Sequence, residues 1–364
     1  MQRPWMQSMG AGIAGGWRLA TCAAVQPARV RHLGILRTAR SSVVRAPDNL
    51  RRARSIAIGN PSPVKSRSQA IGIGRLISTF VLLVAVLQMA HAAQEIAIEH
   101  EGVRRSYLIL TPTEYDPAVA LPLVIALHGT NMRAADMLRH TDLPRKANSA
   151  RFILVSPNSL GTAFNDGLAP PGSDAAGVND VGFIQAVAED AKARYRIRAN
   201  SIFLVGFSNG GSMAQRVAIE SRYPFAGYAS VANATRVQTE GVSNPASTLL
   251  VFGTADPFNP VAGGQVDMPV KSVKPSHETT AKKWAERLGC LDSPPTSPLE
   301  KGVQARIWTQ CRSGARLAWY EIEGLGHHWA GAEPMPFPSF IIGEQVTSPN
   351  LTDLVWAFLS PGSN

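Results

Sequence analysis

Six short apolar runs, spread over residues 122–324, constrain the fold of this chain more than any other feature of its sequence. They are PLVIALHG, RFILVSP, SIFLVGFS, YASVAN, TLLVFGTAD and LAWYEIEG. Most are too short and too rich in β-branched residues for buried helices, so we expect them to form buried strands. Continuous apolar strands of this kind are typical of a parallel sheet that is covered on both faces.

Helical patterns lie between several of these runs. Apolar residues recur at helical spacing in two sets, Ile184, Val187, Ala188 and Ala191, and Ala281, Trp284, Ala285 and Leu288. The alternation of strand and helix predicts an α/β fold with a mostly parallel, doubly wound sheet. Ahead of it, residues 95–100 and 104–110 alternate apolar and polar positions, which predicts an N-terminal antiparallel hairpin.

The first 92 residues differ in composition from the rest of the chain. Residues 76–92 hold an apolar run that ends at Ala90-His91-Ala92, which predicts a secretory signal segment with an A-x-A cleavage site; an uncleaved membrane anchor is the alternative. Residues 1–75 contain 13 Lys and Arg against one acid. We interpret them as a disordered basic leader, or as translation assigned upstream of the true start.

Residues 93–364 are then expected to form a single catalytic domain that is secreted or periplasmic. The whole chain has 36 Lys and Arg against 26 Asp and Glu, but the leader holds the excess, which leaves 23 basic and 25 acidic residues after residue 75. This near-neutral balance argues against a nucleic acid as partner. We also expect no stable membrane insertion once the signal is cleaved.

One of the apolar runs leads into a serine that is flanked by glycines. Gly206-Phe207-Ser208-Asn209-Gly210 lies between a predicted strand and a predicted helix. This is the G-x-S-x-G nucleophile elbow in the context that it requires. The turn is so sharp that side chains at positions 206 and 210 would collide with neighbouring backbone. Ser208 is therefore the predicted nucleophile, with a purely structural turn as the alternative.

A serine nucleophile needs a base and an orienting acid, which follow it here in the order Asp, His. Asp256 comes directly after the run TLLVFGT, whereas Asp267 and Asp292 fall in loop-like segments, so Asp256 is the predicted acid. An Asx-turn before Pro257 is its alternative role, and the two roles can coexist. The segment GLGHHWAG, residues 324–331, supplies the base, but its position alone leaves two adjacent histidines as candidates.

The end of the run PLVIALHGT predicts a further part of the site. We expect the backbone N–H groups of Thr130 and Asn209 to form an oxyanion hole, and His128 to pack and orient the loop. The loop of residues 161–179 either covers the site or is a plain surface excursion. The other histidines lack metal-ligand spacing and the sequence holds no phosphate-loop pattern, so we expect neither a metal nor a cofactor.

Five motifs together resemble those of secreted polyhydroxybutyrate depolymerase-like and feruloyl esterase-like α/β-hydrolases: LVIALHGT, VNDVGFIQAV, VGFSNGGSMA, GTADPFNP and GLGHHWAG. The resemblance covers most of residues 100–360 and implies the α/β-hydrolase fold. In the family's last motif the histidine lies two residues before a tryptophan, which assigns the base to His327. The chain departs from the family pattern at Asn179, Ala330 and Phe164, and these departures leave the substrate open.

These features predict a secreted serine carboxylic-ester hydrolase that acts through Ser208, His327, Asp256 and an acyl-enzyme. The expected substrate is an aryl, acetyl or hydroxyalkanoate ester, either small or linked to a polysaccharide. Four side chains are candidates for contacting it: Trp329, His328, Phe164 and Phe207. The alternatives are a secreted polymer- or carbohydrate-binding protein without turnover, and a small serine peptidase of the same fold.

Two of the three cysteines, Cys290 and Cys311, lie in the predicted domain, and the third, Cys22, lies in the leader. Export favours a disulfide between the first two, as do the paired cysteines at similar places in the family. Such a bridge is expected to tie the end of a helix to the start of the strand that leads to His327. Two separately buried thiols are the alternative.

Overall fold

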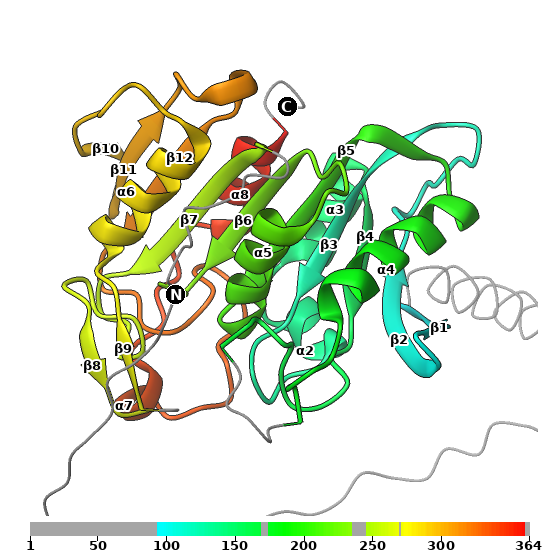
Figure 1. The fold of residues 1–364 in the computed structure, drawn as a ribbon, viewed down its shortest axis with the longest axis horizontal. Coiled ribbons are helices and arrows are strands. Elements are labelled where there is room, and N and C mark those ends of the chain that lie inside the picture. The colour runs from blue at the N-terminus through cyan, green and yellow to red at the C-terminus, as the bar shows by residue number, and fades with distance from the viewer. Residues whose placement is uncertain (1–92, 169–173, 235–244, 269–270, 361–364) are drawn as a thin grey trace, which may run out of the picture. The chain divides into compact units, whose positions relative to one another are not determined.

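A long twisted sheet runs through the residues that the structure, a computed structural model, describes: 93–168, 174–234, 245–268 and 271–360 (Figure 1). From one edge to the other it consists of β1 (Gln94–His100), β2 (Val103–Leu110), β4 (Ile153–Pro157), β3 (Leu121–Leu127), β5 (Ile197–Phe207), β6 (Gly227–Val231), β7 (Ser247–Gly253), β12 (Leu317–Ile322), β11 (Val303–Trp308) and β10 (Ser297–Glu300). The predicted leader and signal segment lie outside the described residues.

Helices pack on both faces of this sheet (Figure 1). On one face lie α4 (Asp180–Arg194), α5 (Asn209–Glu220) and α6 (His277–Leu288), and on the other lie α2 (Ala134–Arg139), α3 (Leu143–Ala150) and α8 (Leu351–Leu359). The smaller elements are the hairpin β8 (Gly264–Val266) and β9 (Ser272–Lys274), the 3₁₀ turn η1 (Arg312–Gly314) and α7 (Ser339–Ile342). Within the described ranges, no helix is long and apolar enough to span a membrane.

The centre of the sheet is parallel and its edges are antiparallel. Every neighbouring pair from β4 to β12 runs parallel, whereas β1, β2, β11 and β10 pair antiparallel. Glu101 and Gly102 join β1 to β2 with φ of 52° and 75°, the left-handed pair that suits a two-residue hairpin turn. The predicted mostly parallel sheet with its N-terminal hairpin is therefore confirmed. The second antiparallel edge was not predicted, because β10 is exposed along its whole length and carries no apolar run.

Successive residues of a strand pack into two separate cores, one on each face of the sheet. In β3, Leu123, Ile125 and Leu127 belong to the core on the face that carries α4, α5 and α6, while Val124 and Ala126 belong to the core on the face that carries α2, α3 and α8. All seven residues of this strand are buried. Burial on both faces removes the need for polar alternation, which is why the central strands appear in the sequence as unbroken apolar runs.

A buried ion pair fixes the start of α4 beside the first strands. The guanidinium of Arg105 on β2 lies 2.7 Å from the carboxylate of Asp180, and its carbon lies 3.8 Å from the centre of the Phe183 ring. Asp180 also accepts a hydrogen bond from the backbone N–H of Asn165, so the ion pair holds the loop before α4 as well. Asn179 caps this helix through its side-chain oxygen, a role that asparagine and aspartate fill equally well. Asn179 therefore serves as the helix cap as well as an aspartate would.

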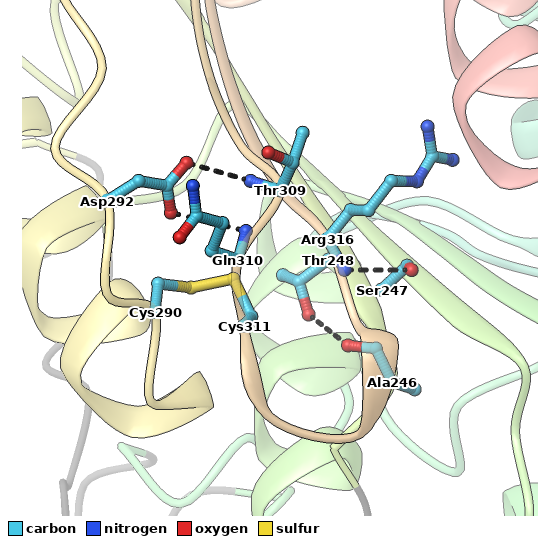
Figure 2. The surroundings of a disulfide bond; sticks show 9 residues. All are labelled: Ala246, Ser247, Thr248, Cys290, Asp292, Thr309, Gln310, Cys311 and Arg316. Carbon is cyan, nitrogen blue, oxygen red and sulfur yellow. Dashed lines mark hydrogen bonds between the residues drawn. A yellow bond between two sulfur atoms is a disulfide. The ribbon is translucent and has the colours of Figure 1, made fainter.

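A disulfide joins Cys290 to Cys311, as predicted (Figure 2). Cys290 follows Gly289, which ends α6 in the left-handed conformation with φ of 61°. Cys311 lies between β11 and η1, in the connection that leads to β12. Nearby, the Asp292 carboxylate accepts hydrogen bonds from the backbone N–H groups of Thr309 and Gln310. The bridge therefore ties the end of α6 to the segment that enters β12.

Replacing both cysteines with alanine is expected to lower the stability of the fold and to leave the site intact. In the chain-entropy model, closing a loop of this length contributes about 3 kcal/mol. For a domain of this size that corresponds to a melting temperature lower by roughly 6 to 12 °C. Thermal unfolding followed by circular dichroism measures the change, and reduced wild-type protein is the matched control. Unlinked peptides of Cys290 and Cys311 in a non-reduced digest of the protein would contradict the bridge.

Candidate active site

Ser208 sits on a sharp turn between the end of β5 and the start of α5. Its φ of 55° and ψ of −118° are unusual for a residue with a side chain, as the elbow geometry requires. A side-chain carbon at Gly206 would overlap the carbonyl oxygen of Gly210, and one at Gly210 would overlap that of Leu127. The steric reason predicted for the two glycines is therefore present in the structure.

The structure brings Ser208, His327 and Asp256 into one hydrogen-bonded line. The Nε2 atom of His327 lies 2.8 Å from the Ser208 Oγ, and its Nδ1 atom lies 2.8 Å from the Asp256 Oδ2. An ionised carboxylate only accepts hydrogen bonds, so Nδ1 carries the proton and Nε2 is left to accept from the serine hydroxyl. The imidazole is thus oriented to take a proton from Ser208.

Asp256 occupies a turn just after β7 and is only 4% exposed. Its Oδ1 accepts hydrogen bonds from the backbone N–H groups of Phe258 and Asn259, and its Oδ2 accepts one from the Asn259 amide. Burial alone would raise the pKa of Asp256, but the facing His327 ring and these donors outweigh it, so the net shift of the pKa is downward. Asp256 therefore forms an Asx-turn and faces the imidazole at the same time.

The other two acids weighed in the sequence lie elsewhere. Asp292 accepts hydrogen bonds beside the disulfide, and Asp267 is exposed and bonded to Gln265. Neither contacts His327 in the described part of the chain. The position of an acid directly after a buried strand was therefore the informative signal.

The two adjacent histidines point to different partners. His328 is buried, and its Nε2 lies 3.2 Å from the carbonyl oxygen of Gly343, to which it donates. Burial lowers the pKa of His328, which keeps the ring neutral. Since only His327 reaches Ser208, the two histidines are placed as the family resemblance implied.

The two predicted oxyanion donors border the serine. Asn209 is the first residue of α5, so its backbone N–H has no acceptor within the helix. Thr130 follows Gly129, and a side-chain carbon on Gly129 would lie 3.2 Å from the Ser208 Cβ, so this loop passes directly beside the elbow. The roles of the N–H groups of Thr130 and Asn209 as oxyanion donors stay a prediction.

Two polar side chains hold the loops on either side of the elbow. The Asn209 amide pairs with the backbone of Phe164, accepting from its N–H at 2.8 Å and donating to its carbonyl at 3.1 Å. His128 donates from Nδ1 to the carbonyl of Gly129 and accepts at Nε2 from the N–H of Ser159. Burial lowers the pKa of His128 to about 4, so it stays neutral and serves to orient the loop.

The four side chains predicted to contact substrate are all buried. Their exposed fractions are 0% for Phe164, 1% for Phe207 and Trp329, and 3% for His328. Trp329 donates its indole N–H to Thr352 on α8, which makes it a packing residue between the His327 loop and that helix. None of the four therefore presents a free face to solvent, and their contact with substrate stays a prediction.

The sequence alone did not identify Phe207, Phe258 and Asn259 as the residues that hold the His327 ring and the acid loop. The rings of Phe207 and Phe258 lie 5.1 and 4.9 Å from the His327 ring, centre to centre. Asn259 is buried and bonded to both oxygens of Asp256. Phe258 and Asn259 both lie in the segment GTADPFNP, residues 253–260. That motif was therefore the sequence signal that could have identified them.

Comparisons with known proteins point to esterases. No protein-family model matches the chain. The chain is 27% identical over 324 residues to "Putative esterase NocK" of Nocardia uniformis subsp. tsuyamanensis, which covers 83% of this chain and 91% of that protein. It is 28% identical over 166 residues to feruloyl esterase C of Emericella nidulans, which covers 44% of this chain and 58% of that protein.

The alignments with feruloyl esterases thus span about three fifths of those relatives. Among solved structures, an acetyl xylan esterase from Aspergillus awamori has 15% sequence identity and a TM-score of 0.47, and the match covers 65% of this chain and 94% of that one. The predicted resemblance to feruloyl esterase-like proteins is confirmed by the sequence relatives, and these support a carboxylic ester hydrolase. The topology of the sheet and the elbow are those of the α/β-hydrolase fold.

Proposed function

We propose that this chain is an exported serine esterase that cleaves carboxylic esters through an acyl-enzyme. The observation that carries the proposal is the His327 imidazole, which lies 2.8 Å from both the Ser208 hydroxyl and the Asp256 carboxylate. A serine hydroxyl is a weak nucleophile at neutral pH and needs such a base. The esterase relatives support the same reaction class.

The geometry supports a two-step reaction. Ser208 attacks the ester carbonyl while His327 takes its proton, and Asp256 stabilises the imidazolium that forms. The negative charge on the carbonyl oxygen is met by the N–H groups of Thr130 and Asn209. His327 then protonates the leaving alcohol, and in the second step it activates a water molecule that releases the acid from Ser208.

We propose an aryl or acetyl ester as the substrate, either small or attached to a plant polysaccharide. The feruloyl esterase relatives support the aryl ester, and an acetylated polysaccharide shares the same bond type. A hydroxyalkanoate oligomer is the remaining candidate from the family resemblance. Of the two rings beside His327, Phe207 is buried and Phe258 is half-buried.

A substrate panel tests this assignment. The full chain is assayed with methyl ferulate, acetylated xylan, a hydroxybutyrate oligomer and a p-nitrophenyl ester, and kcat/KM is compared. We expect methyl ferulate or acetylated xylan to rank above the hydroxybutyrate oligomer. The opposite order would move the protein to the depolymerase class, and hydrolysis of none of the four would argue against an esterase.

Ser208→Ala is expected to remove ester hydrolysis, with a loss in kcat of about 10⁴-fold or more, because no other group in the line can form the acyl-enzyme. Thermal unfolding should change little, because alanine retains the Cβ and removes only the hydroxyl. The readouts are kcat on the p-nitrophenyl ester and covalent labelling by an organophosphonate, which reacts with activated serines. A variant that keeps turnover or labelling would exclude Ser208 as the nucleophile.

The two histidines offer a matched pair of variants. His327→Gln fills a similar space but cannot transfer protons, so kcat should fall by about 10³-fold or more. His328→Gln can still donate to the Gly343 carbonyl, and kcat should stay within about threefold of the wild type. Steady-state kinetics on the p-nitrophenyl ester compares them. A greater loss at position 328 would reassign the base.

A further inference from the structure

His277 is a buried histidine that the proposed reaction does not use. It is the first residue of α6 and has no exposed surface. Its Nδ1 lies 2.6 Å from the Glu321 Oε1, and its Nε2 lies 2.7 Å from the backbone carbonyl oxygen of Asn259. Its ring is stacked on Phe252, with centres 4.1 Å apart and planes 13° apart. The ring is therefore held in one orientation by contacts on three sides.

Both ring nitrogens of His277 face oxygens that accept hydrogen bonds. A carbonyl oxygen has no proton to donate, and neither has an ionised carboxylate. A protonated ring nitrogen of His277 therefore donates to the oxygen that it faces. Glu321 is the carboxylate that faces Nδ1, and its side chain is largely buried beside the ring.

Asn259, the residue that His277 binds, is also the residue that holds Asp256. Its backbone N–H and its side-chain amide donate to the two oxygens of the Asp256 carboxylate, at 3.2 and 3.1 Å. The backbone N–H of His277 donates in turn to the carbonyl of Val261, two residues further on. His277, at the start of α6, therefore bonds to two carbonyl oxygens of the acid loop, residues 256–261.

The His277 contacts also join the two strands that carry the acid and the base. Phe252 lies on β7, four residues before Asp256, and Glu321 lies on β12, six residues before His327. Phe252 and Glu321 are direct partners across these neighbouring parallel strands. A ring that is stacked on one and bonded to the other fixes the acid loop relative to the strand that leads to the base.

We propose that His277, paired with Glu321, is a positioning residue that holds the Asp256 carboxylate against the His327 imidazole. The proposal rests on the proposed function, because it assigns His277 a part in orienting the same site. His277 does not contact the reacting atoms and acts through Asn259. Its loss lets the acid loop shift, and the imidazolium that forms during attack is then less well stabilised.

The test compares two variants of the full chain on a p-nitrophenyl ester. His277→Phe keeps the stacked ring and removes both hydrogen bonds, whereas Glu321→Gln keeps the shape and replaces the carboxylate that faces Nδ1 with an amide. For each we expect kcat lower by about 10- to 100-fold, which is less than the roughly 10⁴-fold expected when the acid itself is lost. KM should stay within about twofold, because His277 and Glu321 do not contact the substrate.

Two further variants separate positioning from general stability. His277→Gln retains an N–H that can donate to the Asn259 carbonyl, so it should recover part of the kcat that His277→Phe loses. Trp284→Phe, on the same helix, removes a buried hydrogen bond to Gln215 and has no contact with the acid loop in the described structure. It should lower the melting temperature and leave kcat unchanged.

Each outcome decides the question. A wild-type kcat in His277→Phe overturns the proposal, as does an equal loss of kcat in Trp284→Phe. If His277→Phe does not fold, Glu321→Gln decides alone, and an unchanged kcat there overturns the proposal. Organophosphonate labelling of Ser208 distinguishes failure of the proposed function from failure of the positioning proposal. Turnover by Ser208→Ala refutes the proposed function, whereas an inactive Ser208→Ala beside a fully active His277→Phe refutes only the positioning role.

Discussion

The close approach of backbone segments at Ser208 is the constraint on which the rest of the site depends. Side chains at Gly206 and Gly210 would overlap carbonyl oxygens of the helix start and of β3, so these segments meet only because both positions are bare. Ser208 keeps its φ of 55° because the surrounding structure holds it there. The hydroxyl is thereby placed at the carboxyl edge of the sheet, so the other groups of the site must lie at that edge.

The parallel order of the central strands brings the remaining groups to that edge. Asp256 and His327 are 71 residues apart in the chain, yet each follows one of two neighbouring parallel strands, β7 and β12. Parallel neighbours end at the same edge, so their following loops meet without any long excursion. A hydrogen-bonded line across distant segments is in this sense a consequence of strand order rather than of local sequence.

The sequence could predict the parts of the site that depend on local geometry. The elbow glycines, the acid after a buried strand and the glycine-flanked histidine each belong to a pattern that a strand end imposes. It could not predict the environment of the aromatic side chains, because alternation within a loop does not tell which side faces solvent. Trp329 and Phe164 were expected at the substrate; both side chains are buried, and their contact with substrate stays a prediction.

The contact between Glu321 and His277 could not be predicted from the sequence for a different reason. Glu321 appears in the sequence as the one polar residue of an apolar strand, and His277 as an ordinary polar residue near a helix start. Their meeting depends on how α6 packs over β7 and β12, which no short segment encodes. The short strands β8, β9 and β10 escaped prediction likewise, since such exposed strands gain their structure from pairing rather than from burial.

A buried carboxylate such as Asp256 is stable as an anion only when surrounding groups replace the water that it has lost. Two backbone N–H groups, one amide and the imidazole do so here. Asn259, which supplies two of these donors, has its own carbonyl to satisfy, and His277 satisfies it. Glu321 faces the other ring nitrogen of His277, so hydrogen-bonding groups run from Asp256 through Asn259 and His277 to Glu321. Because Glu321 keeps 15% of its side chain exposed, this line of polar groups ends at solvent.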